Sequence, residues 1–118
     1  AQVVSFVASW CPACDAELPQ VVDWLETSGP PEDVGFVMVS TNHDDSRQNW
    51  PPQDWFADAG YTGDVLVDDA ASTAFRTYGF TATPSWAVVG GDGQVLFRGS
   101  GMLDPSQFDQ LAELAATG

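Results

Sequence analysis

The hydrophobic positions of the chain form short runs and longer periodic stretches, which predict strands and helices respectively. Short, mainly apolar runs of strand length occur at three places: residues 3–7, 35–40 and 85–89. A brief extended piece is also predicted at residues 65–67. The sequence Gly90-Gly91-Asp92-Gly93 is a strong turn signal, and it predicts a hairpin into a strand at residues 94–98.

The main helix is predicted at residues 11–27, where apolar side chains recur at helical spacing. These side chains are Cys14, Leu18, Val21, Val22 and Leu25. The segment Gly29-Pro30-Pro31 ends this helix. Two shorter helices are predicted at residues 53–59 and 70–78, and the polar residues 41–52 before them form a loop.

A last helix begins at Asp104-Pro105, where an N-cap residue precedes a proline at the first helical position. Its apolar face comprises Phe108, Leu111, Leu114 and Ala115. The element order is strand, helix, strand, and then a hairpin and a helix. This order predicts one α/β domain over residues 1–118, with a central mixed sheet flanked by helices on both faces.

Composition supports a folded domain and restricts its partners. The 118 residues suffice for one core, and 44% of them are hydrophobic. Seventeen acidic residues face three arginines and no lysine, for a net charge of −14. Nucleic acid and anionic membrane surfaces are therefore not expected as partners. The charge is consistent with a generic acidic surface, but the absence of lysine favours adaptation to very high salt, where screening removes the repulsion.

No apolar run approaches the roughly 20 residues of a membrane span, so this domain is not expected to insert into a membrane. The chain starts almost directly in a strand. We therefore expect a fragment of a longer chain, with an export signal or tether upstream.

Two cysteines, Cys11 and Cys14, form a C-x-x-C motif where a strand passes into a helix. Cysteines at this helical spacing have Cα atoms roughly 5 Å apart, which allows a disulfide. The N–H groups at a helix start favour the thiolate of Cys11. Cys11 is therefore predicted to attack a substrate disulfide and Cys14 to resolve the mixed disulfide, while Pro12 rigidifies the first turn.

Three alternatives to a redox pair were weighed. A zinc site is incomplete, because His43 is the only histidine beside the two cysteines. A structural disulfide across so short a loop constrains the unfolded chain very little. Inert core thiols are less expected at a strand-to-helix junction. The pattern therefore favours a redox-active Cys11–Cys14 disulfide, without a metal or other cofactor.

Four segments resemble the TlpA/ResA group of thioredoxin-like proteins. They are FVASWCPACDAELP at residues 6–19, VDD at residues 67–69, YGFTATP at residues 78–84 and DG at residues 92–93. The resemblance implies a thioredoxin-like fold and thiol–disulfide oxidoreductase activity. It also implies that Pro84 follows a cis peptide bond and packs beside the cysteines, and that the backbone of Thr83 pairs with an extended substrate segment next to Cys11.

The chain departs from the family pattern at Val7, where the family has an aromatic residue, and at Ser5, where thioredoxins have aspartate. Ser5 cannot serve as a buried carboxylate base. Glu17, three residues after Cys14 on the same helix, is the predicted substitute, since partial burial would raise its pKa. The family also carries glutamate at this position. A solvated surface acid is the alternative interpretation.

Trp10, Pro12 and Pro84 are predicted to form an exposed apolar rim that holds a polypeptide. The loop that contains His43 falls at the same sheet edge as the cysteines, where it either shapes access or is simply solvated. The other tryptophans, Trp24, Trp50, Trp55 and Trp86, are expected to serve packing.

Three features are expected to raise the pKa of Cys11: no histidine lies between the cysteines, Glu17 is near, and the protein is anionic. The sequence therefore favours a reductant over a strong oxidant. The predicted partners are a disulfide-containing protein substrate outside the cytoplasm and an upstream thiol electron donor, with the chain a monomer. By resemblance, cytochrome c maturation is one such role. A cytoplasmic general thioredoxin, a thiol peroxidase and an interaction domain with a structural disulfide are the alternatives.

Overall fold

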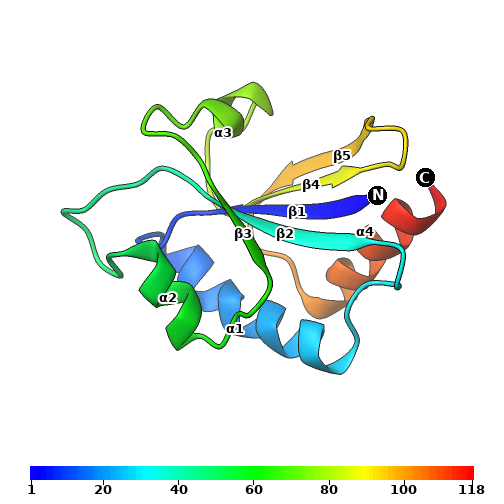
Figure 1. Cartoon of the computed structure of the whole chain (residues 1–118), viewed down its shortest axis with the longest axis horizontal. Coiled ribbons are helices and arrows are strands. Elements are labelled where there is room, and N and C mark those ends of the chain that lie inside the picture. The colour runs from blue at the N-terminus through cyan, green and yellow to red at the C-terminus, as the bar shows by residue number, and fades with distance from the viewer.

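A single five-stranded mixed sheet organises the chain, and the computed structural model describes all 118 residues (Figure 1). Its strands are β1 (Gln2–Val7), β2 (Gly35–Ser40), β3 (Asp64–Val67), β4 (Ser85–Val89) and β5 (Val95–Ser100). They lie in the order β3-β2-β1-β4-β5. The first three strands run parallel, and β4 and β5 are antiparallel to their neighbours. The predicted mixed sheet is therefore confirmed.

Helices cover both faces of this sheet, as predicted. They are α1 (Pro12–Thr27), α2 (Pro52–Asp58), α3 (Thr73–Thr77) and α4 (Pro105–Thr117). Residues of α1, α2 and α4 share core clusters with one face of the sheet, whereas α3 packs against the other face. Figure 1 shows this division, with α3 alone above the strands.

Aromatic side chains hold α1 and α4 to the sheet. The Phe108 ring of α4 stacks on Trp86 of β4, with ring centroids 5.2 Å apart, and meets Trp24 of α1 edge-on at 5.7 Å. The start of α4 is fixed by the predicted N-cap, since the Asp104 side chain accepts the N–H of Gln107 and Gln107 bonds back to Asp104. The larger part of the hydrophobic core lies on the face of the sheet that α1 and α4 cover.

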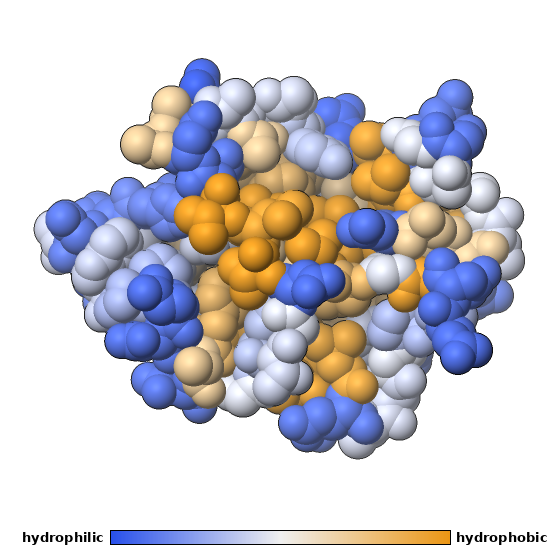
Figure 2. Space-filling view, viewed as in Figure 1, coloured by the Kyte–Doolittle hydropathy of each residue, from blue (hydrophilic) through white to orange (hydrophobic).

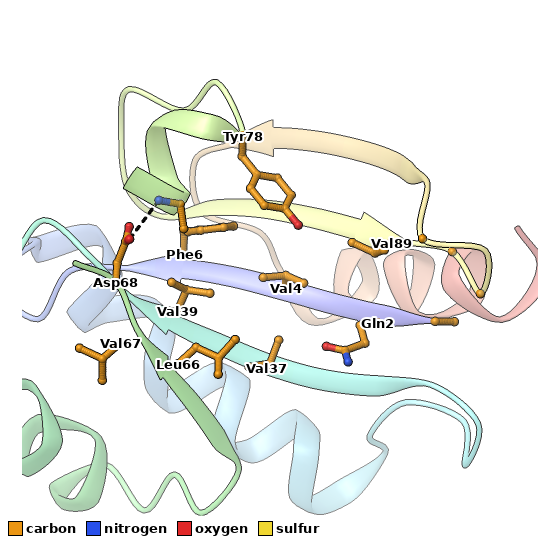
Figure 3. Close-up of a pocket in the computed structure, with 15 residues that line it drawn as sticks. Gln2, Val4, Phe6, Val37, Val39, Leu66, Val67, Asp68, Tyr78 and Val89 are labelled. Carbon is orange, nitrogen blue, oxygen red and sulfur yellow. Dashed lines mark hydrogen bonds between the residues drawn. The ribbon is translucent and has the colours of Figure 1, made fainter. Parts of the chain in front are cut away.

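The opposite face is only partly covered. Phe6 of β1 packs against Phe80 and Phe75 around α3, with ring centroids 5.2 and 6.3 Å away. Beyond α3 an open hollow of about 690 Å³ follows the strands, lined mainly by hydrophobic residues and ending at Leu66 and Val67 of the edge strand (Figure 3). Figure 2 shows the apolar side chains gathered over the middle of this surface. The hollow lies on the face away from α1 and its cysteines.

One predicted helix differs in extent, and another differs in the residues that it buries. The helix predicted at residues 70–78 covers only Thr73–Thr77, because Ser72 adopts a left-handed conformation with φ of 55° that cannot belong to the helix. In α4, Leu114 is half-buried, and the small Ala112 takes its place in the core. Close approach of the helix to the sheet favours the smaller side chain there.

Candidate active site

The cysteine pair sits where β1 passes into α1. After β1 ends, the N–H of Cys11 donates to the carbonyl of Ala8 at 3.1 Å, which turns the chain into the helix. Cys11 is the N-cap residue of α1, and its Sγ accepts the backbone N–H of Cys14 at 3.3 Å. The sulfur of Cys11 therefore fills the capping position that a serine or aspartate oxygen usually occupies.

Accessibility separates the two thiols. Cys11 keeps 6% of its surface exposed, whereas Cys14 is 0% exposed and lies under the helix among core side chains. Both are free thiols in this structure. Cys11 is therefore the more accessible of the two residues, and Cys14 is closed off from solvent.

The pKa values of the two thiols also differ. Burial alone raises the pKa of Cys11, but hydrogen bonding with the Cys14 thiol, with Thr83 and with the backbone of Cys14 outweighs burial, so the pKa lies below its ordinary value. Complete burial raises the pKa of Cys14, and the neighbouring Cys11 sulfur raises it further. Cys11 is therefore the thiolate of the pair and Cys14 the thiol.

The expectation that Cys11 has a raised pKa is wrong. Hydrogen bonds act directly on the Cys11 sulfur, whereas Glu17 does not contact it. Burial raises the pKa of Glu17 to about 7, so this acid carries its full negative charge only above neutral pH. The net charge of the surface is screened by solvent. Local donors therefore decide the ionisation of Cys11.

The segment before β4 lies across from the cysteines. The Thr83–Pro84 peptide bond is cis, as the resemblance implies. The Cys11 thiol donates to the carbonyl of Thr83 at 3.4 Å, which brings residues 72 positions apart into contact. Thr83 itself is half-buried.

The predicted apolar rim is smaller than expected. Pro84 is among the fully buried side chains and cannot contact a substrate through an exposed surface. Pro84 lies directly before β4, whose first residue is Ser85. Pro12 is exposed and Trp10 is half-buried, so only these two remain at the surface beside Cys11.

The loop between β2 and α2 holds the residues before Cys11 in place. The Trp10 indole donates to the carbonyl of Asn42 at 2.7 Å, and the Asn49 amide donates to the carbonyl of Ser9 at 2.9 Å. The guanidinium of Arg47 lies over the Trp10 ring, 4.2 Å from its centroid. Sequence reasoning missed this clamp, because nothing in a polar loop reveals which residues it will contact.

His43 does not take part in that clamp. Its Nε2 lies 3.1 Å from Oγ of Ser40, at the end of β2. It neither contacts a sulfur nor lies over Trp10. His43 is half-buried at this position, so it is not simply solvated, and the role of its loop in access to the cysteines stays a prediction.

Glu17 is a buried acid of α1, only 1% exposed. Its Oε2 accepts the backbone N–H of Leu103 at 2.9 Å, in the segment that precedes α4. Its other oxygen has no hydrogen-bond partner. The alternative of a solvated surface acid is therefore excluded by burial.

Two further polar residues lie buried on the same face, and sequence reasoning gave them no role beside Glu17. Ser5 was read only as a missing base, and Trp86 only as packing. Both lack a partner for their side-chain polar atom, Oγ of Ser5 and Nε1 of Trp86. An alternating strand pattern could have placed them on the α1 face, but not their lack of partners.

No group of three or more histidine, cysteine, aspartate or glutamate side chains is arranged to hold a metal ion. None of the four helices combines the length and apolar character needed to cross a bilayer.

Comparison with known proteins gives one family and a group of similar folds. The sequence profile of the Redoxin family matches residues 1–114. StoA from Bacillus subtilis is 22% identical, with a TM-score of 0.77 over 93% of this chain and 80% of that one. A secreted disulfide oxidoreductase of Mycobacterium tuberculosis, homologous to E. coli DsbE, is 19% identical, with a TM-score of 0.73 over 96% of this chain and 80% of that one. The exposed lipoprotein thioredoxin of Streptococcus pneumoniae is 23% identical, with a TM-score of 0.74 over 96% and 83%.

Proposed function

This chain belongs to the Redoxin family and is a thiol–disulfide oxidoreductase of the thioredoxin-like type, and we propose that it reduces disulfide bonds in other proteins. In this proposal Cys11 is the attacking nucleophile and Cys14 the resolving thiol. The observation that carries the assignment is the difference in exposure, 6% for Cys11 against 0% for Cys14, at a hydrogen-bonded pair of neighbours.

The first step is a thiolate exchange. The sulfur of Cys11 attacks one sulfur of the substrate disulfide, forms a mixed disulfide with it, and releases the other sulfur as a thiolate that takes a proton from solvent. The half-buried Thr83 and the exposed Pro12 flank the route to this sulfur. Thr83 presents its backbone to the substrate segment, and Trp10 contributes an apolar contact beside Pro12.

The second step needs the proton of Cys14 to leave. Glu17 lies one helical turn along α1 and is buried with it, so its carboxylate accepts this proton. The Cys14 sulfur then attacks Cys11, the Cys11–Cys14 disulfide forms, and the second substrate sulfur leaves as a thiolate. Two electrons have passed from the cysteine pair to the substrate. A pKa of about 7 suits Glu17 to take and return a proton near neutral pH.

The absence of cationic groups at the sulfurs supports a reductant, although hydrogen bonds lower the pKa of Cys11. A strong oxidant of the C-x-x-C type needs heavy stabilisation of its reduced thiolate, commonly from cationic neighbours. Here no lysine, arginine or histidine side chain bonds either sulfur, and the groups that donate to the Cys11 sulfur, among them the backbone N–H of Cys14, are neutral. The expected reduction potential is nearer to about −270 mV, as in thioredoxin, than to about −120 mV, as in DsbA.

Substrates outside the cytoplasm fit this proposal. Two of the similar structures come from proteins described as secreted and as an exposed lipoprotein. The net charge of −14 disfavours anionic surfaces and gives a basic substrate protein an electrostatic advantage. The partners are then a disulfide-containing protein and an upstream thiol donor that re-reduces the Cys11–Cys14 disulfide. The domain acts as a monomer and needs no cofactor beyond this pair.

Reduction of insulin by dithiothreitol, with the protein as catalyst, tests the function directly. We expect catalysed reduction in the wild type and its loss in Cys11→Ser, with no appreciable consumption of hydrogen peroxide. Rapid peroxide consumption without insulin reduction would instead identify a thiol peroxidase. Neither activity would identify an interaction domain, and a reduction potential near −120 mV would contradict the assignment as a reductant.

A further inference from the structure

Three buried side-chain polar atoms in the whole chain have no hydrogen-bond partner. They are Oγ of Ser5, Oε1 of Glu17 and Nε1 of Trp86. Their residues are 0%, 1% and 1% exposed, so bulk solvent cannot satisfy them. Burial of an unpaired polar group is costly, and a few such groups in one place call for a common explanation.

The three atoms belong to one region of the fold. Ser5 of β1 and Trp86 of β4 stand directly opposite each other in the antiparallel ladder. Because side chains alternate along a strand, Ser5 faces the same side as Val3 and Val7, which pack beneath α1. Trp86 belongs to that same side, in the cluster with Val3.

Glu17 reaches this pair from α1. The Trp86 indole N–H lies close enough to the Glu17 carboxyl to lower its pKa, although less than burial raises it, but it lies outside the geometry of a direct hydrogen bond. Val3 packs in the cluster that contains Trp86, and Val7 packs in the cluster that contains Cys14. Ser5 stands between these two valines, so it lies between the cluster that contains Trp86 and the cluster that contains the cysteine pair.

One water molecule could bond all three side chains of Ser5, Glu17 and Trp86, because their hydrogen-bonding capacities differ. An indole N–H only donates, a carboxylate oxygen only accepts, and a hydroxyl does both. A single water molecule accepts from Trp86, donates to Glu17 and bonds Ser5. Three hydrogen bonds to otherwise unpaired groups is the usual number for a buried water.

We propose that Ser5, Glu17 and Trp86 form a buried site for one water molecule, which positions the Glu17 carboxyl for proton exchange with Cys14. The positioning role rests on the proposed function, whereas the water site does not. Ser5 and Trp86 are positioning residues, since they act on the reaction only through Glu17. The water gives the carboxylate the second hydrogen bond that Leu103 cannot supply.

The surroundings of Glu17 leave few other groups to explain its titration. On α1 the nearby titratable group is Cys14, and β1 and β4 contribute no charged side chain beside Ser5 and Trp86. The segment before α4 contributes the N–H of Leu103 and, one residue later, the exposed Asp104. Loss of the indole donor is therefore expected to act on Glu17 directly.

Nuclear magnetic resonance of the reduced protein tests the site. In the wild type we expect a cross-peak between water and the indole proton of Trp86, and none for Trp24, whose indole donates to Asp109 at 2.7 Å. Titration of the Glu17 carboxyl carbon gives the second readout. Trp86→Phe and Ser5→Ala are each expected to raise the pKa of Glu17 by about one pH unit, because the carboxylate loses a donor.

The matched control is Trp24→Phe, which removes an indole N–H from the same face of the sheet and is expected to leave the pKa of Glu17 unchanged. Ser5→Ala deletes one small group, so it reads out the site even where Trp86→Phe folds poorly. No water contact at Trp86, or no change in the pKa of Glu17 in the two variants, would overturn the inference. Trp24→Phe is expected to reduce insulin at the wild-type rate. If insulin reduction is lost in Cys11→Ser but the water site is not found, the proposed function stands and only the water site is overturned.

Discussion

Leu103 donates its backbone N–H to Oε2 of Glu17 at 2.9 Å, which ties the segment before α4 to the active-site helix across 86 positions of the chain. This bond stabilises the charged carboxylate, but burial opposes it more strongly and raises the pKa of Glu17 to about 7. The acid is therefore neutral in much of the folded population below neutral pH. Both the stability and the reactivity of the protein depend on this balance.

Glu17→Gln is expected to change how stability depends on pH. The pKa of Glu17 rises from 4.5 to about 7 on folding, so its neutral form favours the fold and that contribution is lost as pH rises through about 7. A glutamine at this position does not ionise, so the variant does not lose stability at Glu17 as the pH rises. Relative to the wild type, the variant should gain about 3 kcal/mol between pH 4 and pH 8.

Urea denaturation at a series of pH values measures this difference. Glu26→Gln is the control, because Glu26 lies on the exposed face of the same helix. If the stability difference between Glu17→Gln and the wild type stays constant with pH, the burial of Glu17 does not perturb its titration.

The same substitution should slow the second step of exchange. Without a carboxylate to accept the Cys14 proton, the mixed disulfide between Cys11 and a substrate resolves about 100-fold more slowly, at the lower end of what general bases contribute. Stopped-flow mixing of the preformed mixed disulfide, followed by release of a chromogenic thiol, gives this rate. An unchanged rate at pH 8 would assign the proton of Cys14 to solvent.

Asp68 is predicted to be the main polar anchor of α3. Its carboxylate accepts the backbone N–H groups of Ala74 and Phe75 and the hydroxyl of Thr41, at 3.0, 3.1 and 2.8 Å. Burial alone raises the pKa of Asp68, but these hydrogen bonds outweigh burial and lower it. Asp68→Asn should destabilise the protein by about 2 kcal/mol at pH 7.

A lowered pKa means that this stabilisation is present at neutral pH and is lost as pH falls through the pKa of the folded state. The difference between wild type and Asp68→Asn should therefore shrink at acidic pH. Thermal denaturation at pH 7 and pH 3 follows it, with the exposed Asp58→Asn as control. A difference that grows on acidification would contradict the anchoring role of the carboxylate.

The strands and the cysteine pair could be predicted because their signals are local. A mainly apolar run such as residues 85–89 can be only a strand or a short buried helix, and the turn after it selects the strand. Glu17 was identified from its spacing to Cys14 and from the resemblance. Its hydrogen bond to Leu103 and its closeness to Trp86 were not, because contacts between distant segments have no signature in the sequence.

The orientation of Pro84 was also beyond the sequence. Its place beside the cysteines followed from the resemblance, but whether a side chain points to solvent depends on the strand that follows it. The pKa of Cys11 was predicted in the wrong direction for a similar reason. Net charge and sequence neighbours are visible in a sequence, whereas the donors that surround a sulfur are not.

High salt should stabilise this domain. Only one ion pair is present, between Arg47 and Asp44 at 3.8 Å, and both residues are exposed. Arg76 and Arg98 bond backbone carbonyls instead, so most of the seventeen acids repel one another without compensation. The Debye length falls from about 30 Å at 0.01 M to about 3 Å at 1 M, which removes most of this repulsion.

We therefore expect the midpoint of thermal unfolding to climb steeply from dilute buffer and to keep climbing into the molar range. Sodium chloride and potassium chloride should act alike, because screening depends on ionic strength. A midpoint that is flat, or highest in dilute buffer, would leave only a generic acidic surface and rule out adaptation to high salt.

The division of labour between the two cysteines is the central claim, and trapping of mixed disulfides tests it most directly. Each single variant, Cys11→Ser and Cys14→Ser, is mixed in the reduced form with a disulfide-containing protein such as insulin. Non-reducing electrophoresis and mass spectrometry then measure the covalent adduct. The account predicts that Cys14→Ser accumulates an adduct through Cys11, while Cys11→Ser forms none because Cys14 is 0% exposed. An adduct that forms through Cys14 in the Cys11→Ser variant, with none in Cys14→Ser, would contradict it.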